Sequence, residues 1–244
     1  MISDPSSFKG FSKESFKFFA ELSENNSLQW FAQNRERYDN YIILPAKTII
    51  NHLAPFFHQL EPKINTEPKF DKTMLRINKD ARFSDKVPYR KYLLIFFRRF
   101  KIDSEFFIHI DKNGIEYGLY INNTLGNELY FNKNLPGHKD ELVEIFRRLG
   151  LNEKFDFYEM KKDPELISRN FNIEKDFNIM ARTKSFLLQK ELKNDSEIIN
   201  KSDFLLELLK TFSQLYPIYC FSISHNPLAL IEKFEQEIGI PNKT

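Results

Sequence analysis

The hydrophobic pattern of the first sixty residues has the period of amphipathic helices. After Ser12, a favoured N-cap residue, Phe16 and Phe19 follow helical spacing. Asn26 predicts the cap of a second helix. One broad face of that helix then holds a set of mainly aromatic side chains: Trp30, Phe31, Asn34, Tyr38 and Tyr41. Pro45 predicts the start of a third helix, because proline is favoured in a first helical turn.

The pattern changes to that of strands in the middle of the chain. Residues 73–78 place Leu75 and Ile77 on one face of a strand and Met74, Arg76 and Asn78 on the other, and residues 92–97 form an almost continuous apolar run. Residues 106–110 and 115–121 predict a β-hairpin, because Asn-Gly at 113–114 is the strongest short-range hairpin signal. These segments indicate an antiparallel sheet whose apolar face is covered by helices.

A two-residue turn at Asn113 and Gly114 fixes a register for this hairpin. Three apolar pairs then face one another: Ile110 with Tyr117, Ile108 with Leu119, and Phe106 with Ile121. The same register places His109 opposite Gly118 on the other face. Because glycine leaves room for a ligand or another chain, His109 is a candidate ligand-binding residue. The plainer interpretation is a surface histidine on a strand.

The last third of the chain is mixed. Residues 138–149 predict a helix that ends at Gly150, and Asp163-Pro164 predicts the opening of a short helix. Residues 177–191 are ambiguous, and within them 185–189 are consistent with an edge strand.

Two helices are expected near the end of the chain. Ser202 begins a helix that reaches about Leu215 and is stopped by Pro217. Asn226-Pro227 begins a last helix that ends at Gly239.

The chain as a whole predicts a single α+β domain over residues 1–244, with a mainly antiparallel sheet covered by amphipathic helices. Neither a linker nor an internal repeat divides the 244 residues, and 26 Phe indicate a Phe-rich core. Cys220 is the single cysteine, so no intrachain disulfide can form, and its apolar neighbours predict a buried thiol. The sequence shows no signal peptide and no apolar run near the roughly 20 residues of a membrane span. A cytoplasmic location without a membrane partner is therefore expected.

Charge is concentrated in one stretch. Residues 76–91 read RINKDARFSDKVPYRK, and residues 76–101 hold nine Lys and Arg against two Asp, although the whole chain carries a net charge of only +2. Such a local excess favours an anionic partner at this place over a uniformly basic surface for nucleic acid.

The same stretch carries a family resemblance. Residues 76–83 read RINKDARF, and residues 85–89 read DKVPY. They resemble the motif R-x-x-R-D-x-R-F, a short gap and D-K-x-x-Y of DUF2461, a bacterial family of unknown function. The segment NNSLQWF at 25–31, followed by Tyr38, is similar to a second family motif. The resemblance covers at least residues 16–121.

Two positions depart from the family motif. Lys79 stands where the family usually has Arg, which keeps the charge but loses the planar guanidinium fork. The gap between the two halves holds only Ser84 and is shorter than in the family.

The central stretch is interpreted first as a site for a small anionic or phosphorylated ligand. Guanidinium, ammonium and phenol groups suit phosphate or carboxylate recognition. The candidate ligand-binding residues of this stretch are Arg76, Lys79, Arg82, Lys86, Tyr89 and Arg90. Asp80 is a weaker candidate for an acid or base.

Three alternatives stay open for the same residues. The loop could be a structural latch of internal ion pairs, a docking surface of a non-enzymatic interaction protein, or a nucleic-acid site. The excess of cations over carboxylates favours a ligand over a latch, and the apolar run at 92–97 disfavours an open nucleic-acid surface. The five His lack metal-ligand spacing, so no metal is expected. No Walker A, Rossmann or nucleophile-elbow motif indicates an enzyme class or a cofactor.

Overall fold

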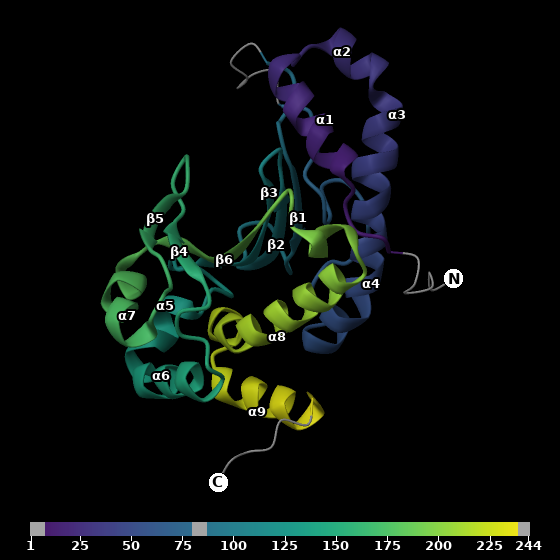
Figure 1. Ribbon diagram of the computed structural model, residues 1–244. Coiled ribbons are helices and arrows are strands. Elements are labelled where there is room, and N and C mark those ends of the chain that lie inside the picture. The colour runs from purple at the N-terminus through teal and green to yellow at the C-terminus, as the bar shows by residue number, and fades with distance from the viewer. Residues whose placement is uncertain (1–7, 80–86, 239–244) are drawn as a thin grey trace. The chain divides into compact units, whose positions relative to one another are not determined.

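The structure of the protein is a computed structural model, which describes residues 8–79 and 87–238 (Figure 1). Within this part of the chain, six strands form one sheet with the hydrogen-bonded order β1-β2-β3-β6-β4-β5. The strands are β1 (Leu93–Phe97), β2 (Glu105–Ile110), β3 (Gly114–Asn122), β4 (Asp156–Glu159), β5 (Glu165–Ser168) and β6 (Ser185–Lys193). β4 pairs antiparallel with both β5 and β6. This arrangement confirms the predicted α+β class with a mainly antiparallel sheet.

Helices lie before, between and after the strands along the chain. The longer ones are α1 (Lys13–Glu24), α4 (Leu44–Leu60), α6 (Lys139–Arg148), α7 (Ile173–Arg182), α8 (Asp203–Ile223) and α9 (Pro227–Ile238). The shorter ones are α2 (Leu28–Gln33), α3 (Arg35–Tyr38), α5 (Phe131–Asn134), a π-helical turn (Asp39–Ile43) and 3₁₀ turns at Leu135–Gly137 and Glu197–Asn200.

The chain divides into two compact units. Unit 1 consists of Met1–Arg99, Phe107–Tyr117 and Glu191–Leu209, and unit 2 consists of Phe100–Phe106, Gly118–Lys190 and Lys210–Thr244. Strands β2, β3 and β6 each contribute residues to both units. The expectation of a single domain stays a prediction, and each unit is described by itself.

Unit 1 begins with helices that differ from the predicted ones in how they join. Pro45 lies in the first turn of α4, as predicted, but the π-helical turn Asp39–Ile43 joins α4 to α3 without the expected break. Pro45 cannot donate a hydrogen bond to the carbonyl of Tyr41, four residues earlier, because proline lacks an N–H. The buried hydroxyl of Ser15 in α1 donates to this carbonyl at 2.7 Å instead. The π turn thus joins two predicted helices. The hydrogen bond from Ser15 attaches this turn to α1.

Aromatic rings form the core of unit 1, as the Phe content predicts. Phe18 and Phe19 of α1 are fully buried, and the Phe18 ring centroid lies 5.6 Å from that of Tyr38. Phe57 of α4 stacks on Phe97 of β1 with ring centroids 4.1 Å apart. These contacts join the N-terminal helices to the first strand.

Residues 73–78 do not form the continuous strand that their alternation predicts. Met74 pairs with Ile95 of β1 through an isolated antiparallel bridge, and Asn78 makes a second bridge with Tyr89. The chain therefore leaves the edge of β1 and pairs with a different segment. Predicted strand 92–97 is confirmed as β1.

The β2–β3 hairpin is confirmed, but its predicted register was wrong. The N–H of Asp111 donates to the carbonyl of Gly114 at 3.1 Å, and the Asp111 carboxylate accepts from the N–H of Asn113 at 2.7 Å. The turn residues are thus 112 and 113, one position earlier than predicted. His109 consequently meets Glu116, its Nδ1 lying 3.3 Å from Glu116 Oε2.

Unit 2 contains β4, β5 and helices α5, α6, α7 and α9, with α6 in contact with α7 (Figure 1). Helix α6 confirms the prediction for 138–149, and Gly150 follows it with φ +58°. Asp163-Pro164 leads into strand β5 rather than a helix, which corrects that prediction. The segment predicted as an edge strand, 185–189, lies in β6 between β3 and β4 in the interior of the sheet.

Helix α8 continues through Pro217, contrary to the prediction that the proline stops it. The residues around this proline are almost completely buried: Leu215, Tyr216, Ile218, Tyr219, Cys220 and Phe221. Burial of several large side chains outweighs the roughly 3 kcal/mol that a proline costs inside a helix. The last predicted helix is confirmed as α9 up to Ile238, and Gly239 lies outside the described residues.

Candidate functional site

The two arms of the basic stretch pair with each other. Residues 76–79 and 87–90, which we call the hairpin base, form a short antiparallel ladder around the bridge between Asn78 and Tyr89. The ladder consists of one hydrogen bond on each side of this pair. Lys79 N–H donates to Pro88 O at 2.9 Å, and Arg90 N–H donates to Ile77 O at 2.7 Å. The sequence alone indicated a long loop, and the structure shows that its ends are held together as a hairpin.

Three of the candidate site residues come between these two arms in the sequence. Asp80, Arg82 and Lys86 fall in 80–86, outside the described residues, so their predicted roles stay predictions.

Tyr89 is buried rather than exposed to a ligand. Its ring stacks on Phe31 of α2 with centroids 4.2 Å apart, and only 5% of the residue is accessible. Phe31 in turn contacts Tyr38, whose centroid is 5.2 Å away. Burial raises the pKa of the Tyr38 hydroxyl, so this ring stays neutral. Tyr89 thus attaches the hairpin base to the rings of Phe31 and Tyr38, which we call the aromatic layer.

The backbone of Tyr89 is held by the side chain of Asn26. Asn26 Nδ2 donates to the Tyr89 carbonyl at 2.9 Å, and Asn26 Oδ1 accepts from the Tyr89 N–H at 3.0 Å. The predicted capping role of Asn26 was wrong, since Ser27 is the N-cap and its Oγ accepts from Trp30 N–H. The segment at 25–31 therefore contacts the basic stretch directly.

Arg90 also has a structural role. Its Nη1 donates to the carbonyl of Arg76 at 2.9 Å and to that of Asn78. One guanidinium group thereby ties the second arm to two carbonyls of the first. These contacts were invisible in the sequence, because their acceptors are backbone atoms that every residue carries.

Arg76 is the exposed residue among the candidate cations that the structure describes. Arg76 Nε lies 2.6 Å from Asp71 Oδ2, and both side chains are about 60% exposed, at 61% and 59%. Such an exposed pair contributes roughly 0–1 kcal/mol, so an incoming anion can compete with Asp71. Lys79 is half-buried at the tip of the described ladder.

His109 lies apart from the hairpin base in sequence but on the strand next to β1. Its ring centroid is 4.8 Å from that of Tyr92, which is two residues beyond Arg90. The predicted space opposite His109 is not there. Glu116 stands opposite, and an added Cβ on Gly118 would meet the Leu188 carbonyl of β6 at 2.0 Å. Gly118 therefore accommodates a neighbouring strand and not a ligand.

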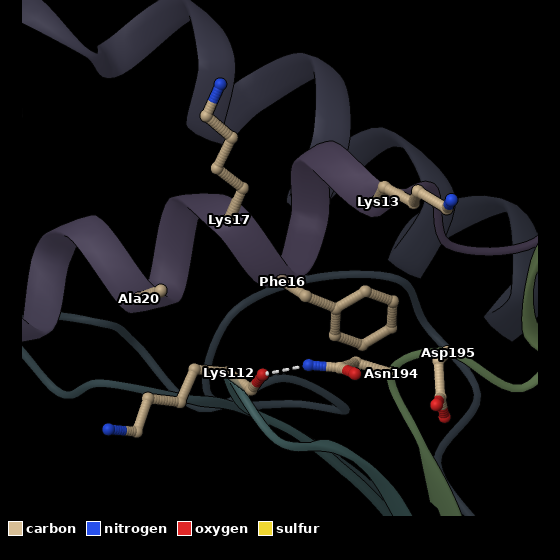
Figure 2. Close-up of a pocket in the computed structure, with 7 residues that line it drawn as sticks. All are labelled: Lys13, Phe16, Lys17, Ala20, Lys112, Asn194 and Asp195. Carbon is tan, nitrogen blue, oxygen red and sulfur yellow. Dashed lines mark hydrogen bonds between the residues drawn. The ribbon is translucent and has the colours of Figure 1, made fainter.

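A shallow depression of about 310 Å³ lies between α1 and the turn of the β2–β3 hairpin. Figure 2 shows the Phe16 ring over it, with Asn194 donating to the Lys112 carbonyl at 2.8 Å. The ammonium groups of Lys13, Lys17 and Lys112 point in different directions. Because these ammonium groups do not converge, the depression presents no cluster of cations to an anion.

Ion pairs connect the elements that carry the aromatic layer. Arg37 of α3 donates to Glu21 of α1 at 2.6 Å and approaches Glu14 at 3.4 Å. The hydrogen bond from Arg37 lowers the pKa of the Glu21 carboxyl. The helices that support the hairpin base are thus linked by charge as well as by packing.

Two further searches of residues 8–79 and 87–238 give negative results. No group of three or more His, Cys, Asp or Glu side chains is arranged to hold a metal ion. No helix there has both the length and the apolar character needed to cross a membrane.

Fold and site define an α+β protein in which an N-terminal aromatic helical layer anchors a basic hairpin beside an antiparallel sheet. The protein belongs to the family described as "Conserved hypothetical protein (DUF2461)", which matches residues 14–221 of the 244-residue chain. Comparison with curated proteins gives no match.

Proposed function

We propose that the protein binds a small anionic or phosphorylated ligand at the basic hairpin, residues 76–91. The observation that carries this proposal is the fixed hairpin base, whose two arms are joined by backbone hydrogen bonds and by Arg90. Arg76 and Lys79 stand on this base, and Arg82 and Lys86 belong to the same hairpin in the sequence. A preorganised set of cations binds an anion with less loss of conformational entropy than a flexible loop.

The local charge supports an anion further. Nine basic residues against two acidic ones give residues 76–101 a local excess of positive charge, which favours an anionic partner. Within the described residues, Arg90 and Tyr89 supply structural contacts, so the ligand contacts fall to Arg76, Lys79, Arg82 and Lys86.

The proposal is tested by thermal unfolding with phosphate, pyrophosphate, nucleotides, sugar phosphates, dicarboxylates and short oligonucleotides. A ligand present at 100 times its Kd stabilises the native state by about 2.7 kcal/mol, or roughly 5–10 °C for a chain of this size. We expect one class of anion to raise the Tm of the wild type, and the increase to be lost in Arg76→Ala and Arg82→Ala.

A matched control is Arg169→Ala. Arg169 is also an exposed arginine paired with a carboxylate, Asp156 at 3.3 Å, but it lies far from the basic stretch in sequence. It should keep the full ligand-induced shift. If only oligonucleotides raise the Tm, the hairpin is a nucleic-acid site. If no compound raises it and Arg82→Ala merely unfolds earlier, the basic stretch is a structural latch and the proposal is wrong.

A further inference from the structure

Each of the three residues between α1 and α2 makes a different hydrogen bond. Asn25 is the C-cap of α1, and its backbone N–H donates to the Glu21 carbonyl at 2.9 Å. Ser27 is the N-cap of α2. Asn26, between them, points its side chain at Tyr89, which is 63 positions away in the sequence. The two caps fix the backbone on either side of Asn26 and so orient its amide.

The ladder geometry explains what Asn26 adds. The hydrogen bonds of the ladder are made by Lys79 N–H and Arg90 N–H, so Asn78 and Tyr89 form a non-hydrogen-bonded pair. In such a pair, the N–H and C=O of Tyr89 face outward, away from the first arm. The Asn26 amide accepts from this N–H at 3.0 Å and donates to this C=O at 2.9 Å. It thus makes the two hydrogen bonds that a further strand would make.

An asparagine is well suited to this position. Its side chain carries a donor and an acceptor side by side at the spacing of a peptide group. Aspartate of the same shape cannot donate to the Tyr89 carbonyl, and alanine supplies neither group. Together with the ring of Tyr89 stacked on Phe31, the Asn26 amide fixes one arm of the hairpin base through both its backbone and its side chain.

We infer that Asn26 is a positioning residue for the anion site: it holds the hairpin base against the α1–α2 junction so that Arg76 and Lys79, the cations of that base, are preorganised for a ligand. This inference rests on the proposed function. Asn26 acts through Tyr89 and does not touch the ligand. Its removal should therefore weaken anion binding by releasing the hairpin base, while the helical core stays folded.

The test compares Asn26→Ala with Ser27→Ala in the full chain. Ser27→Ala removes the neighbouring helix cap but leaves the Asn26 amide, so it controls for general loss of stability. Amide hydrogen exchange is measured at Tyr89, Lys79 and Arg90, and at Leu53 in the buried part of α4. The Kd for pyrophosphate is measured by calorimetry.

In Asn26→Ala we expect exchange at the hairpin amides to be at least tenfold faster, and pyrophosphate to bind at least tenfold more weakly. Exchange at Leu53 should stay within twofold of the wild type. Ser27→Ala should lower the Tm without changing the Kd. If Asn26→Ala does not fold, Asn26→Asp keeps the shape and the acceptor, and it should give the same pattern of exchange.

Two results would overturn the inference. Unchanged exchange at Tyr89 would mean that Asn26 does not hold the hairpin base. Faster exchange with an unchanged Kd would mean that Asn26 only stabilises the fold. Absence of pyrophosphate binding in the wild type would instead contradict the proposed function with this probe, and the exchange rates would still decide whether Asn26 holds the hairpin.

Discussion

Single glycines in this protein are required where strands approach one another. A Cβ on Gly118 would lie 2.0 Å from the carbonyl oxygen of Leu188 and 2.8 Å from the Cα of Gln189. Both are backbone atoms of β6 and cannot move aside as a side chain can. We expect Gly118→Ala to lower the free energy of unfolding by roughly 1–3 kcal/mol, measured by urea denaturation.

Gly137 provides the matched control for Gly118. An added Cβ there would meet no atom within 4 Å. Gly137→Ala should therefore change the free energy of unfolding by no more than about 0.5 kcal/mol. Equal stability of the two alanine variants would show that β6 can shift to accept a methyl group.

The site residues illustrate what a sequence can and cannot predict at this scale. The excess of charge at 76–101 and the aromatic character of Phe31 and Tyr89 are visible in the sequence. The partners of Arg90 and Asn26 are backbone groups, which carry no sequence signal. The resemblance of residues 25–31 to a family motif was the one available indication, and local capping explained Asn26 equally well.

At the scale of elements, one buried hydroxyl of α1 contacts the π-helical turn between α3 and α4. Ser15 is fully buried and donates to the Tyr41 carbonyl at 2.7 Å, a carbonyl that Pro45 cannot serve. We expect Ser15→Ala to lower the free energy of unfolding by roughly 1–2 kcal/mol, since a partly buried carbonyl loses its partner. Chemical denaturation measures this change.

Ser23→Ala is the control on the same helix. Its hydroxyl donates to the Phe19 carbonyl four residues earlier, at 2.8 Å. That carbonyl already lies within the hydrogen-bonded helix, so losing the hydroxyl should change stability by less than about 0.5 kcal/mol. If Ser15→Ala were equally mild, water or a shift of the helix would be satisfying the Tyr41 carbonyl.

Element prediction succeeded where side-chain periodicity decides and failed where tertiary contacts decide. β1, the β2–β3 hairpin, α6 and α9 follow local patterns. The register of the hairpin was wrong because the Asp111 carboxylate accepts from the N–H of Asn113 and moves the turn by one residue. The end of α8 was wrong because burial around Pro217 outweighs its local effect. The interior place of β6 was missed because pairing with β3 and β4 is a long-range property.

For the whole molecule, the open question is whether its two compact units unfold together. Strands β2, β3 and β6 each pass from one unit to the other, so neither unit is a continuous piece of chain. A break within a strand interrupts the hydrogen-bond ladder on both sides of the boundary. We therefore expect one cooperative transition, as the single-domain prediction requires.

The sequence supplies one natural probe for each unit. Trp30, the only tryptophan, belongs to unit 1 and packs 5.5 Å from the Phe18 ring. Cys220, the only cysteine, belongs to unit 2 and is fully buried. Tryptophan fluorescence and pulsed thiol labelling across a urea series should give the same midpoint.

Gly118→Ala in unit 2 and Ser15→Ala in unit 1 should each lower both midpoints together. Separate midpoints, or a variant that moves only the probe of its own unit, would show that the chain folds as two domains despite the strands they share.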